Sequence, residues 1–309
     1  MDVFRNPQKA GKSLHGPVVA IGNFDGVHLG HRKVFFAALT MAKELGVPWA
    51  PMTFDPHPAK VLAPGLAPQL ITTMQDRLAL IEESGPAATI VMPFDEEIAS
   101  LTPRQYAQEI LKEKLKVSGV VVGYDFTFGS NRDGKTEDLE RFGREMGFRV
   151  AVVDAFSVGG MVVSSTKIRA FVLSGRVYAA SLLLGRPLIL SGEVVHGDGR
   201  GASLGFPTAN VDVEQELNPA PGVYAAWCCW DDHQYPAAIN VGSVPTFRTN
   251  GRTTVEAFIL DWSGDLYGKH VNVDFIRRLR PEVRYDSAEE LVAQIKKDVR
   301  RTRETLMKL

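Results

Sequence analysis

Residues 22–31, which read Gly-Asn-Phe-Asp-Gly-Val-His-Leu-Gly-His, decide the fold of the first half of the chain. The apolar run VVAI precedes them at residues 18–21, and a helix-like stretch follows from about His31 to Leu45. A strand, a glycine turn and a helix N-terminus in this order bind anions, because the unpaired N–H groups of the first helical turn point at the ligand. The stretch therefore predicts a phosphate site at the first strand–helix junction.

The same alternation of short apolar runs and longer helix-like stretches continues from Val18 to about Val153. This rhythm predicts a Rossmann-like α/β domain with a parallel sheet and helices on both faces. The strands are almost entirely apolar, as strands buried on both faces must be. Further strands are predicted at 48–54, 119–123 and 148–154, and further helices at about 73–84 and 103–115.

The texture of the sequence changes after Pro187. Before it, Gly175 and Gly185 each close a short predicted helix. After it, short strand-like runs recur at intervals of roughly ten residues, which predicts a small antiparallel β-barrel. A final amphipathic helix is predicted from about Ser287, where Ser287 and Glu290 form a capping box. We therefore predict two domains, residues 1–186 and 187–309, with barrel strands around 188–195, 222–230, 235–242, 253–260 and 270–279.

Composition narrows the class of protein. The chain has 35 lysines and arginines against 36 aspartates and glutamates, so its overall charge does not favour nucleic acid or an anionic membrane. Residues 1–16 lack the apolar core of a signal peptide, and no apolar run is long enough to span a bilayer. We expect a cytoplasmic monomer or weak homo-oligomer. Cys228 and Cys229 are adjacent in an apolar run, which predicts buried strand residues and not a disulfide or a zinc site.

Two histidines, His28 and His31, stand at the start of the first long helix. Imidazole donors placed three residues apart there can neutralise charge that grows on a phosphoryl group and its leaving pyrophosphate. The alternative is a helix cap with two ordinary histidines. The H-x-G-H spacing directly after a strand favours the catalytic interpretation, and it resembles the signature of the nucleotidyltransferase superfamily.

Three further motifs follow predicted strands, at residues 54–58, 123–129 and 164–169. Because ligands of open α/β sheets bind beyond the carboxyl ends of the strands, we expect the motifs to form one crevice. Hydroxyls and a planar guanidinium suit triphosphate oxygens, and a carboxylate after a strand accepts from a ribose or adenine, or caps a turn. Rings in this region either wall a flat ligand or belong to the core. The residues in question are Ser165, Thr166 and Arg169 for the phosphates, Asp125 for the carboxylate, and Pro56, Pro58, Tyr106 and Phe128 for the wall.

The barrel half has its own polar constellation. Residues 192–211 are rich in glycine, and Thr208 and Asn210 follow on one face of an extended segment. Oxygen donors of this kind suit Mg²⁺, and the alternative is a hairpin with a capping threonine. Glu256 lies alone in the apolar run TTVEAFIL. It is either a general base for a primary alcohol or a carboxylate on the solvent face of an edge strand.

The four motifs G-x-F-D-G-x-H-x-G-H, F-D-P-H-P, V-G-x-D-F-x-F-G and S-S-T-x-I-R together resemble the bacterial FAD synthetases over residues 18–186. The resemblance implies transfer of an adenylyl group from ATP to FMN, giving FAD and pyrophosphate. Thr127 and Leu62 depart from the residues that this family often carries. The resemblance implies catalytic roles for His28, His31 and Arg169, nucleotide contacts for Gly22, Phe24, Asp25, Gly123, Asp125, Ser165 and Thr166, and flavin contacts for Asp55, Pro56, Pro58, Tyr106 and Phe128.

The barrel half, from Leu188 onward, resembles the riboflavin kinase domain through L-G-F-P-T-A-N, P-G-V-Y, I-N-V-G-x-x-P-T-F and V-E-x-x-I-L-D. The resemblance implies that riboflavin and ATP give FMN and ADP, with Mg²⁺ at both sites of the chain. Ala202 and Ala257 depart from the family pattern. The implied roles are ATP contacts for Gly197, Gly199, Gly201 and Thr208, metal binding for Thr208 and Asn210, and proton removal from the ribityl 5′-hydroxyl for Glu256.

We therefore expect a bifunctional enzyme that binds ATP, riboflavin, FMN and FAD, and neither nucleic acid nor a membrane. Three alternatives remain at this point: a chain with one active half, a flavin-binding carrier without turnover, and another nucleotidyltransferase with an appended barrel. The last leaves the PTAN segment, residues 207–210, without a purpose. Nucleic-acid binding through a tRNA-synthetase-like fold is weaker still, because no basic stripe runs along the sequence.

Overall fold

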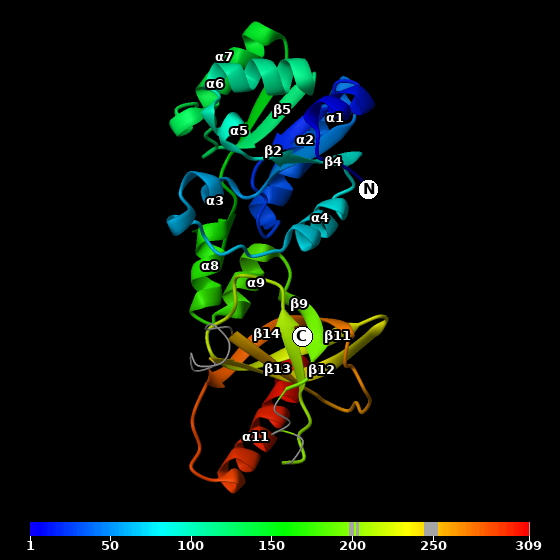
Figure 1. The fold of residues 1–309 in the computed structure, drawn as a ribbon, viewed down its shortest axis with the longest axis vertical. Helices are drawn as coiled ribbons and strands as arrows, with labels where there is room; N and C mark the ends of the chain where they lie inside the picture. Colours follow the sequence, from blue (N-terminus) through cyan, green and yellow to red (C-terminus); the bar gives the residue numbers. More distant parts are fainter. Residues whose placement is uncertain (198–200, 202–203, 244–252, 309) are drawn as a thin grey trace. The chain divides into compact units, whose positions relative to one another are not determined.

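The computed structural model describes residues 1–197, 201, 204–243 and 253–308, in two units, Met1–Ser164 and Ser165–Leu309. Each unit is described by itself (Figure 1). The units divide earlier in the chain than the functional domains predicted at residue 186, so that boundary stays a prediction.

Unit 1 contains a six-stranded sheet in the order β1-β4-β3-β2-β5-β6, with every neighbouring pair parallel. The predicted α/β class is confirmed. The strand order reverses at β2, which lies between β3 and β5, and this is the place where such sheets bind ligands. Two strands were not predicted, namely β1 and β4. The strands are β1 (Asp2–Phe4), β2 (Val18–Ile21), β3 (Trp49–Asp55), β4 (Ala88–Pro93), β5 (Gly119–Gly123) and β6 (Arg149–Val153).

Helices cover both faces of this sheet, and the alternation of side chains along β2 shows why. Val19 and Ile21 belong to one hydrophobic cluster, together with residues of α1, η2 and α7, whereas Val18 and Ala20 belong to a second cluster with α2. The helices are α1 (Pro7–Leu14), α2 (Leu29–Leu45), α3 (Pro58–Leu62), η1 (Pro64–Leu66), α4 (Met74–Glu82), α5 (Glu96–Ser100), α6 (Pro103–Gln105), η2 (Tyr106–Lys114), η3 (Ser130–Arg132) and α7 (Thr136–Met146), and a small hairpin, β7 (Ser157–Val158) and β8 (Met161–Val162), ends the unit.

Unit 2 is built on a closed barrel of strands in the order β10-β13-β12-β11-β14-β9. The predicted barrel is confirmed, and the register pairs all neighbours antiparallel. Cys228 is buried and Cys229 half-buried in β11, both as free thiols. Only β10 was not predicted as a strand. The strands are β9 (Leu188–Val195), β10 (Ala209–Val213), β11 (Gly222–Trp230), β12 (His233–Ser243), β13 (Thr253–Ile259) and β14 (His270–Pro281).

The helices that the structure describes beside the barrel are α8 (Ser165–Leu173), α9 (Val177–Leu184) and α11 (Ala288–Leu306). Gly175 and Gly185 have the left-handed φ values, 74° and 73°, that the predicted helix ends require. The cap of α11 is confirmed as well, since the Glu290 N–H donates to the Ser287 hydroxyl at 3.2 Å.

A buried ion pair fixes α11 to the barrel. Arg280 on β14 donates from Nη2 to Oδ2 of Asp298 at 2.8 Å, and its Nε donates to both oxygens of the same carboxylate. Asp298 is 4 % exposed, so the pair is largely withdrawn from water. A planar guanidinium and a carboxylate in this geometry fix the orientation of the helix as well as its position.

Burial raises the pKa of Asp274 on β14 to about 6, against 3.8 for an unperturbed carboxyl. As the pH rises from 3.8 to about 6, the unfolded chain loses this proton before the folded chain does, so the folded state loses stability over this range and carries the full penalty at higher pH. We expect Asp274→Asn to raise the free energy of unfolding of unit 2 by on the order of 1 kcal/mol at pH 8. Urea unfolding should show no gain at pH 3.5. Asp232→Asn, at an exposed turn of the same barrel, is the control and should change neither value.

Candidate active site

The loop after β2 has an unusual backbone. Phe24 and Val27 adopt left-handed φ angles of 48° and 38°, and Gly26 between them has φ 83°. Left-handed conformations are costly for Val and Phe, and they persist only where the surroundings hold the chain in place. Here the surroundings do so, because the side chains of Phe24 and Val27 are buried in the cluster under α2. Gly22 begins the loop, with a Phe24 ring carbon 2.8 Å from the position that a Cβ would take.

His28 is the N-cap of α2. Its Nδ1 accepts a hydrogen bond from the His31 N–H at 3.2 Å. Because Nδ1 accepts, the neutral ring carries its proton on Nε2, which can donate to an anion. The two rings stack with centroids 3.5 Å apart, and the ring of Phe24 packs edge-on against His31 at 5.3 Å. Both histidines are thus held at the helix start. His28 is also a helix cap, so the capping role and the predicted catalytic role do not exclude each other.

Gly30 permits this stacking. A Cβ at this position would lie 3.2 Å from two atoms of the His28 ring. The glycine of the H-x-G-H motif therefore leaves room for the ring.

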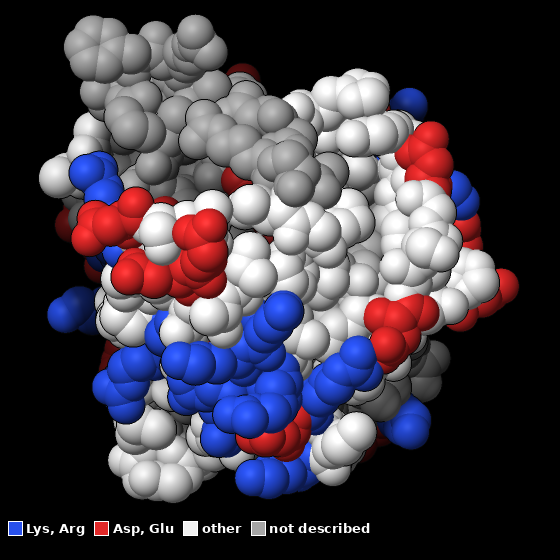
Figure 2. Space-filling view, turned by 90° about the horizontal axis from the view of Figure 1, so that it is seen from below, with Lys and Arg blue, Asp and Glu red and all other residues white. Residues whose placement is uncertain are grey.

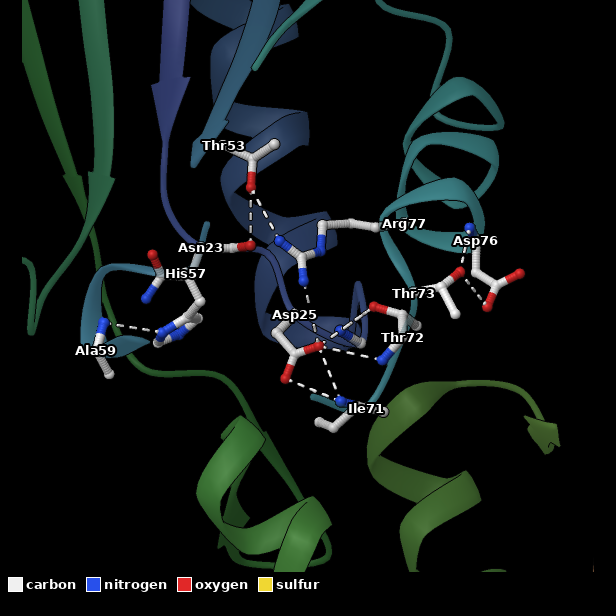
Figure 3. A network of polar contacts seen from close by, with 11 residues as sticks. Asn23, Asp25, Thr53, His57, Ala59, Ile71, Thr72, Thr73, Asp76 and Arg77 are labelled. Atoms are coloured by element: carbon white, nitrogen blue, oxygen red, sulfur yellow. Dashed lines mark hydrogen bonds and ion pairs between the residues drawn. The ribbon is translucent and has the colours of Figure 1, made fainter. Parts of the chain in front are cut away.

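Asp25 anchors the loop to a distant part of the chain (Figure 3). Its carboxylate accepts from the N–H of Ile71 at 3.0 and 3.1 Å, and from the N–H and hydroxyl of Thr72 at 3.2 Å. The Thr72 hydroxyl also accepts from the Gly26 N–H at 3.2 Å. Asp25 is 1 % exposed, and its carboxylate is hydrogen-bonded within the protein. Its predicted contact with the nucleotide stays a prediction.

Arg77 on α4 completes the network in Figure 3. Its Nη2 lies 3.7 Å from Oδ1 of Asp25, and its Nη1 donates to the Thr53 hydroxyl at 3.4 Å. That hydroxyl donates in turn to the carbonyl of Asn23 at 2.9 Å. Arg77 is 1 % exposed and thus holds two points of the loop from within the protein. Sequence reasoning missed Arg77 and Thr53. Thr53 is a polar residue inside an apolar strand, whereas Arg77 follows two polar residues of α4 and has no distinctive sequence signal.

The motif at residues 54–58 follows β3, as predicted. Asp55 ends the strand, and its Oδ2 accepts from Nη1 of Arg5 at 3.0 Å in an exposed ion pair. The two prolines lie at the surface, Pro56 exposed and Pro58 half-buried. Flavin contacts by these three residues stay predictions.

The motif at residues 123–129 follows β5. Gly123 ends the strand, and a Cβ there would lie 3.2 Å from Oδ1 of Asp125. Asp125 is exposed directly beyond the sheet, where a ligand can reach its carboxylate. Thr127, one of the departures from the family pattern, accepts from Nε of Arg132 at 2.9 Å.

Tyr106 and Phe128 belong to the hydrophobic core of unit 1. They are 4 % and 6 % exposed, with ring centroids 5.7 Å apart. Core packing, the alternative to a ligand wall, therefore describes most of their surface. Among the described residues the Tyr106 hydroxyl has no hydrogen-bond partner, and burial raises its pKa strongly. A neutral, buried donor of this kind is satisfied when a polar ligand atom reaches it.

Ser165, Thr166 and Arg169 lie in the first turns of α8. This helix belongs to unit 2, whereas the two histidines belong to unit 1. The meeting of all four strand-end motifs in one crevice therefore stays a prediction.

In the barrel, three polar residues stand abreast on neighbouring strands. Asn210 on β10 pairs with Glu256 on β13, and Glu256 pairs with Asn240 on β12. Their neighbours Val255 and Ala257 are buried inside the barrel, so the polar row lies on its outer face. Because β13 has a strand on each side, Glu256 is not on an edge strand. Sequence reasoning missed Asn240, since only the register places it beside Glu256.

The described glycines of the predicted ATP loop approach this row closely. A Cβ at Gly197 would lie 2.1 Å from the Asn210 amide nitrogen, and one at Gly201 would lie 2.4 Å from the Phe206 carbonyl and 3.2 Å from the Thr208 hydroxyl. Only glycine permits such an approach. Gly199 and Ala202 lie outside the described residues.

The donor set here suits a hard cation. Thr208 and Asn210 offer a hydroxyl and an amide oxygen, and Mg²⁺ binds few protein oxygens because it keeps waters and binds substrate phosphates. Within the described part of the chain, His, Cys, Asp and Glu side chains form no group of three or more that could hold a metal ion.

Comparison with known proteins assigns both halves. Residues 10–167 match the family model described as FAD synthetase, and residues 184–306 match the model described as riboflavin kinase. The chain belongs to the FAD synthetase family. The match to the riboflavin kinase model follows the match to the FAD synthetase model along the chain, in the predicted order.

Curated relatives agree over nearly the whole chain. The bifunctional riboflavin kinase/FMN adenylyltransferase of Escherichia coli K12 is 36 % identical, over 94 % of this chain and 92 % of its own length. The protein of the same name from Bacillus subtilis is also 36 % identical, over 91 % and 90 %.

A crystal structure named as a macrolide-efflux protein from Streptococcus pneumoniae superposes with a TM-score of 0.86 at 31 % identity, and covers 97 % of this chain and 98 % of that one. The word efflux in its name finds no counterpart in the two family models. In the described parts of this chain, none of the helices has both the length and the apolar character needed to cross a membrane.

Arg77→Met tests the anchor of the histidine loop. The substitution leaves the buried Asp25 carboxylate without its cation, and we expect the free energy of unfolding of unit 1 to fall by about 3–5 kcal/mol. The double variant Arg77→Met/Asp25→Asn should be more stable than the sum of the two single variants predicts. Arg104→Met breaks an exposed pair with Glu145 at 2.6 Å and should cost less than about 1 kcal/mol. Equal losses for Arg77→Met and Arg104→Met in urea unfolding would contradict the anchor.

Proposed function

We propose that this FAD synthetase phosphorylates riboflavin to FMN with residues 187–309 and adenylylates FMN to FAD with residues 1–186. Two structural features support the proposal. One is the histidine pair that is fixed at a helix N-terminus after β2, and the other is the row of Asn210, Glu256 and Asn240 on the barrel. The alternatives with one active half or with no turnover leave one or both features without a purpose.

In the adenylylation, an oxygen of the FMN phosphate attacks the α-phosphorus of ATP, and the bond to the bridging oxygen breaks to release pyrophosphate. His28 donates from Nε2 to the phosphate oxygens, and His31, stacked on it, adds a second imidazole. Arg169 supplies a planar cation, and Ser165 and Thr166 supply hydroxyls. Because the reaction needs positioning and charge stabilisation, no covalent nucleophile is required. The strained loop at residues 24–27 keeps the imidazoles in place before ATP arrives.

In the phosphorylation, Glu256 accepts the proton of the ribityl 5′-hydroxyl. The oxygen of that hydroxyl attacks the γ-phosphorus of ATP, and ADP leaves. Thr208 and Asn210 would hold Mg²⁺, which would neutralise charge on the phosphates when bound. Asn240 orients the carboxylate from the opposite side of Glu256. Gly197 and Gly201 lie close to Asn210 and Thr208, and their own N–H groups are the proposed donors to phosphate oxygens.

ATP, riboflavin, FMN and FAD are the proposed ligands, and Mg²⁺ is the proposed metal of both reactions. We also retain the cytoplasmic location, the absence of nucleic-acid and membrane partners, and the monomeric or weakly associated state as predictions. Chromatography of riboflavin, FMN and FAD after incubation with ATP and Mg²⁺ tests the overall proposal. Accumulation of FMN without FAD would restrict the proposal to the barrel half.

His28→Ala should lower the rate of FMN adenylylation by at least about 100-fold, because it removes a donor to the developing phosphate charge. The rate of riboflavin phosphorylation should stay within twofold of the wild-type rate, since the barrel carries its own residues. His15→Asn is the control: His15 is exposed and has φ 53°, which asparagine tolerates. A loss of both activities in folded His28→Ala protein would refute separate sites.

Glu256→Gln should have the opposite effect, because it keeps the shape of the side chain but removes the proton acceptor. We expect riboflavin phosphorylation to fall by roughly 100- to 10,000-fold, with FMN adenylylation retained. Glu193→Gln, which changes an exposed carboxylate on β9 of the same barrel, is the control. Wild-type phosphorylation rates in the Glu256 variant would remove the general-base assignment.

A further inference from the structure

A hollow of about 210 Å³ lies on unit 2, away from the row of Asn210, Glu256 and Asn240. Strand β14, the end of α11 and one residue of α9 line it. Its volume is below the range of about 300–1,000 Å³ that sites for drug-sized ligands occupy. The hollow therefore suits a ligand smaller than a nucleotide or a flavin. Its lining residues are Tyr178, Ile276, Arg277, Arg278, Leu279, Arg301, Glu304, Thr305 and Lys308.

The charge of this hollow is strongly positive. Arg277, Arg278, Arg301 and Lys308 contribute four cations, against the single carboxylate of Glu304. Figure 2 shows a patch of Lys and Arg side chains on the side of the molecule seen from below, with Asp and Glu side chains at its edge and on the surrounding surface. Cations that share a hollow repel one another, so this arrangement is unfavourable until an anion enters.

Glu304, the one carboxylate among the lining residues, pairs with Arg300 at 3.7 Å, outside the hollow. Within the described residues, Arg277, Arg301 and Lys308 have no ion pair. The C-terminal end of α11 attracts cations through its dipole, but this accounts only for residues of the helix. It does not explain the two arginines that β14 brings to the same place.

The hollow also has directional groups. Arg301, Thr305 and Lys308 lie on one face of α11 because they are separated by four and three residues. The guanidinium of Arg277 lies 5.0 Å from the centre of the Tyr178 ring, which limits its freedom. A planar guanidinium can donate two parallel hydrogen bonds to two oxygens of one phosphate. The hydroxyl of Thr305 adds a further donor.

Arg278 provides a second observation. Its Nη2 donates to the carbonyl of Pro221, and its guanidinium lies 6.0 Å from the centre of the Tyr224 ring. Arg278 also lines the hollow, and these two contacts hold its guanidinium in place. The hollow is therefore more organised than a group of mobile surface lysines.

We propose that this hollow binds a small polyanion of the pyrophosphate class. Two linked phosphate groups match the size of the hollow, carry enough charge for its cations, and offer oxygens to the guanidinium groups of Arg277 and Arg301. The proposal does not depend on the proposed reactions, because it concerns binding alone.

Arginine labelling tests the proposal at the residues themselves. The full-length protein is treated with phenylglyoxal in metal-free buffer of constant ionic strength, with and without inorganic pyrophosphate, and the labelled arginines are quantified by mass spectrometry. We expect pyrophosphate at ten times its dissociation constant to slow the labelling of Arg277 and Arg301 by roughly tenfold. The exposed Arg300, which is paired with Glu304, should react at an unchanged rate.

A matched pair of variants completes the test. Arg277→Gln/Arg301→Gln should lose one pyrophosphate site in titration calorimetry, whereas Lys296→Gln/Lys297→Gln removes the same charge from the exposed part of α11 and should lose none. Unchanged binding in the arginine variant would overturn the proposal. So would equal protection by sulfate, which would indicate general charge attraction, or protection by single-stranded RNA without protection by pyrophosphate. Adenylylation and phosphorylation rates in both variants report separately on the proposed function.

Discussion

The pairing of a buried carboxylate with a buried guanidinium constrains the whole first unit. Asp25 and Arg77 are each 1 % exposed, and between them they fix the chain at Asn23, at Ile71 and Thr72, and at Thr53 on β3. Removing two charges from water is costly, and the cost is offset only by close hydrogen bonding and by mutual attraction. The ion pair and its hydrogen bonds hold the loop, which contains two left-handed non-glycine residues, in one conformation. The histidine pair inherits that shape because it directly follows the loop.

The two halves of the chain build phosphate chemistry from different backbone geometries. Unit 1 uses the carboxyl ends of parallel strands, where a helix N-terminus and a tight loop meet at the reversal of strand order. Unit 2 uses the register of an antiparallel barrel, which aligns Asn210, Glu256 and Asn240 across three strands. In the first case the backbone itself is part of the proposed site. In the second case the backbone sets the spacing of side chains.

Much of this could be predicted from the sequence because the signals are local. The β-branched runs gave four of the six parallel strands, and the glycine-separated runs gave five of the six barrel strands. The strands β1 and β4 were missed, and β10 was read only as an extended segment, since its apolar pattern is short. The anchor was missed for another reason: Asp25 meets residues 46 and 47 positions away, and no local pattern marks Arg77 as its partner. Asn240 was missed similarly, because only the register places it beside Glu256. Tyr106 and Phe128 were predicted as flavin contacts or as core residues, and the structure places them in the core. The sequence could not separate the two roles, because aromatic rings suit both.

The cap of α2 has a chemical consequence of its own. His28 uses the lone pair of Nδ1 to accept from the His31 N–H, so this ring can take up a second proton only by giving up the helix cap. Acidification would therefore affect the ring twice, by adding charge and by releasing the first turn of α2. The imidazole that we propose as a phosphate donor also holds the helix in place, so its protonation and the order of the helix start are coupled.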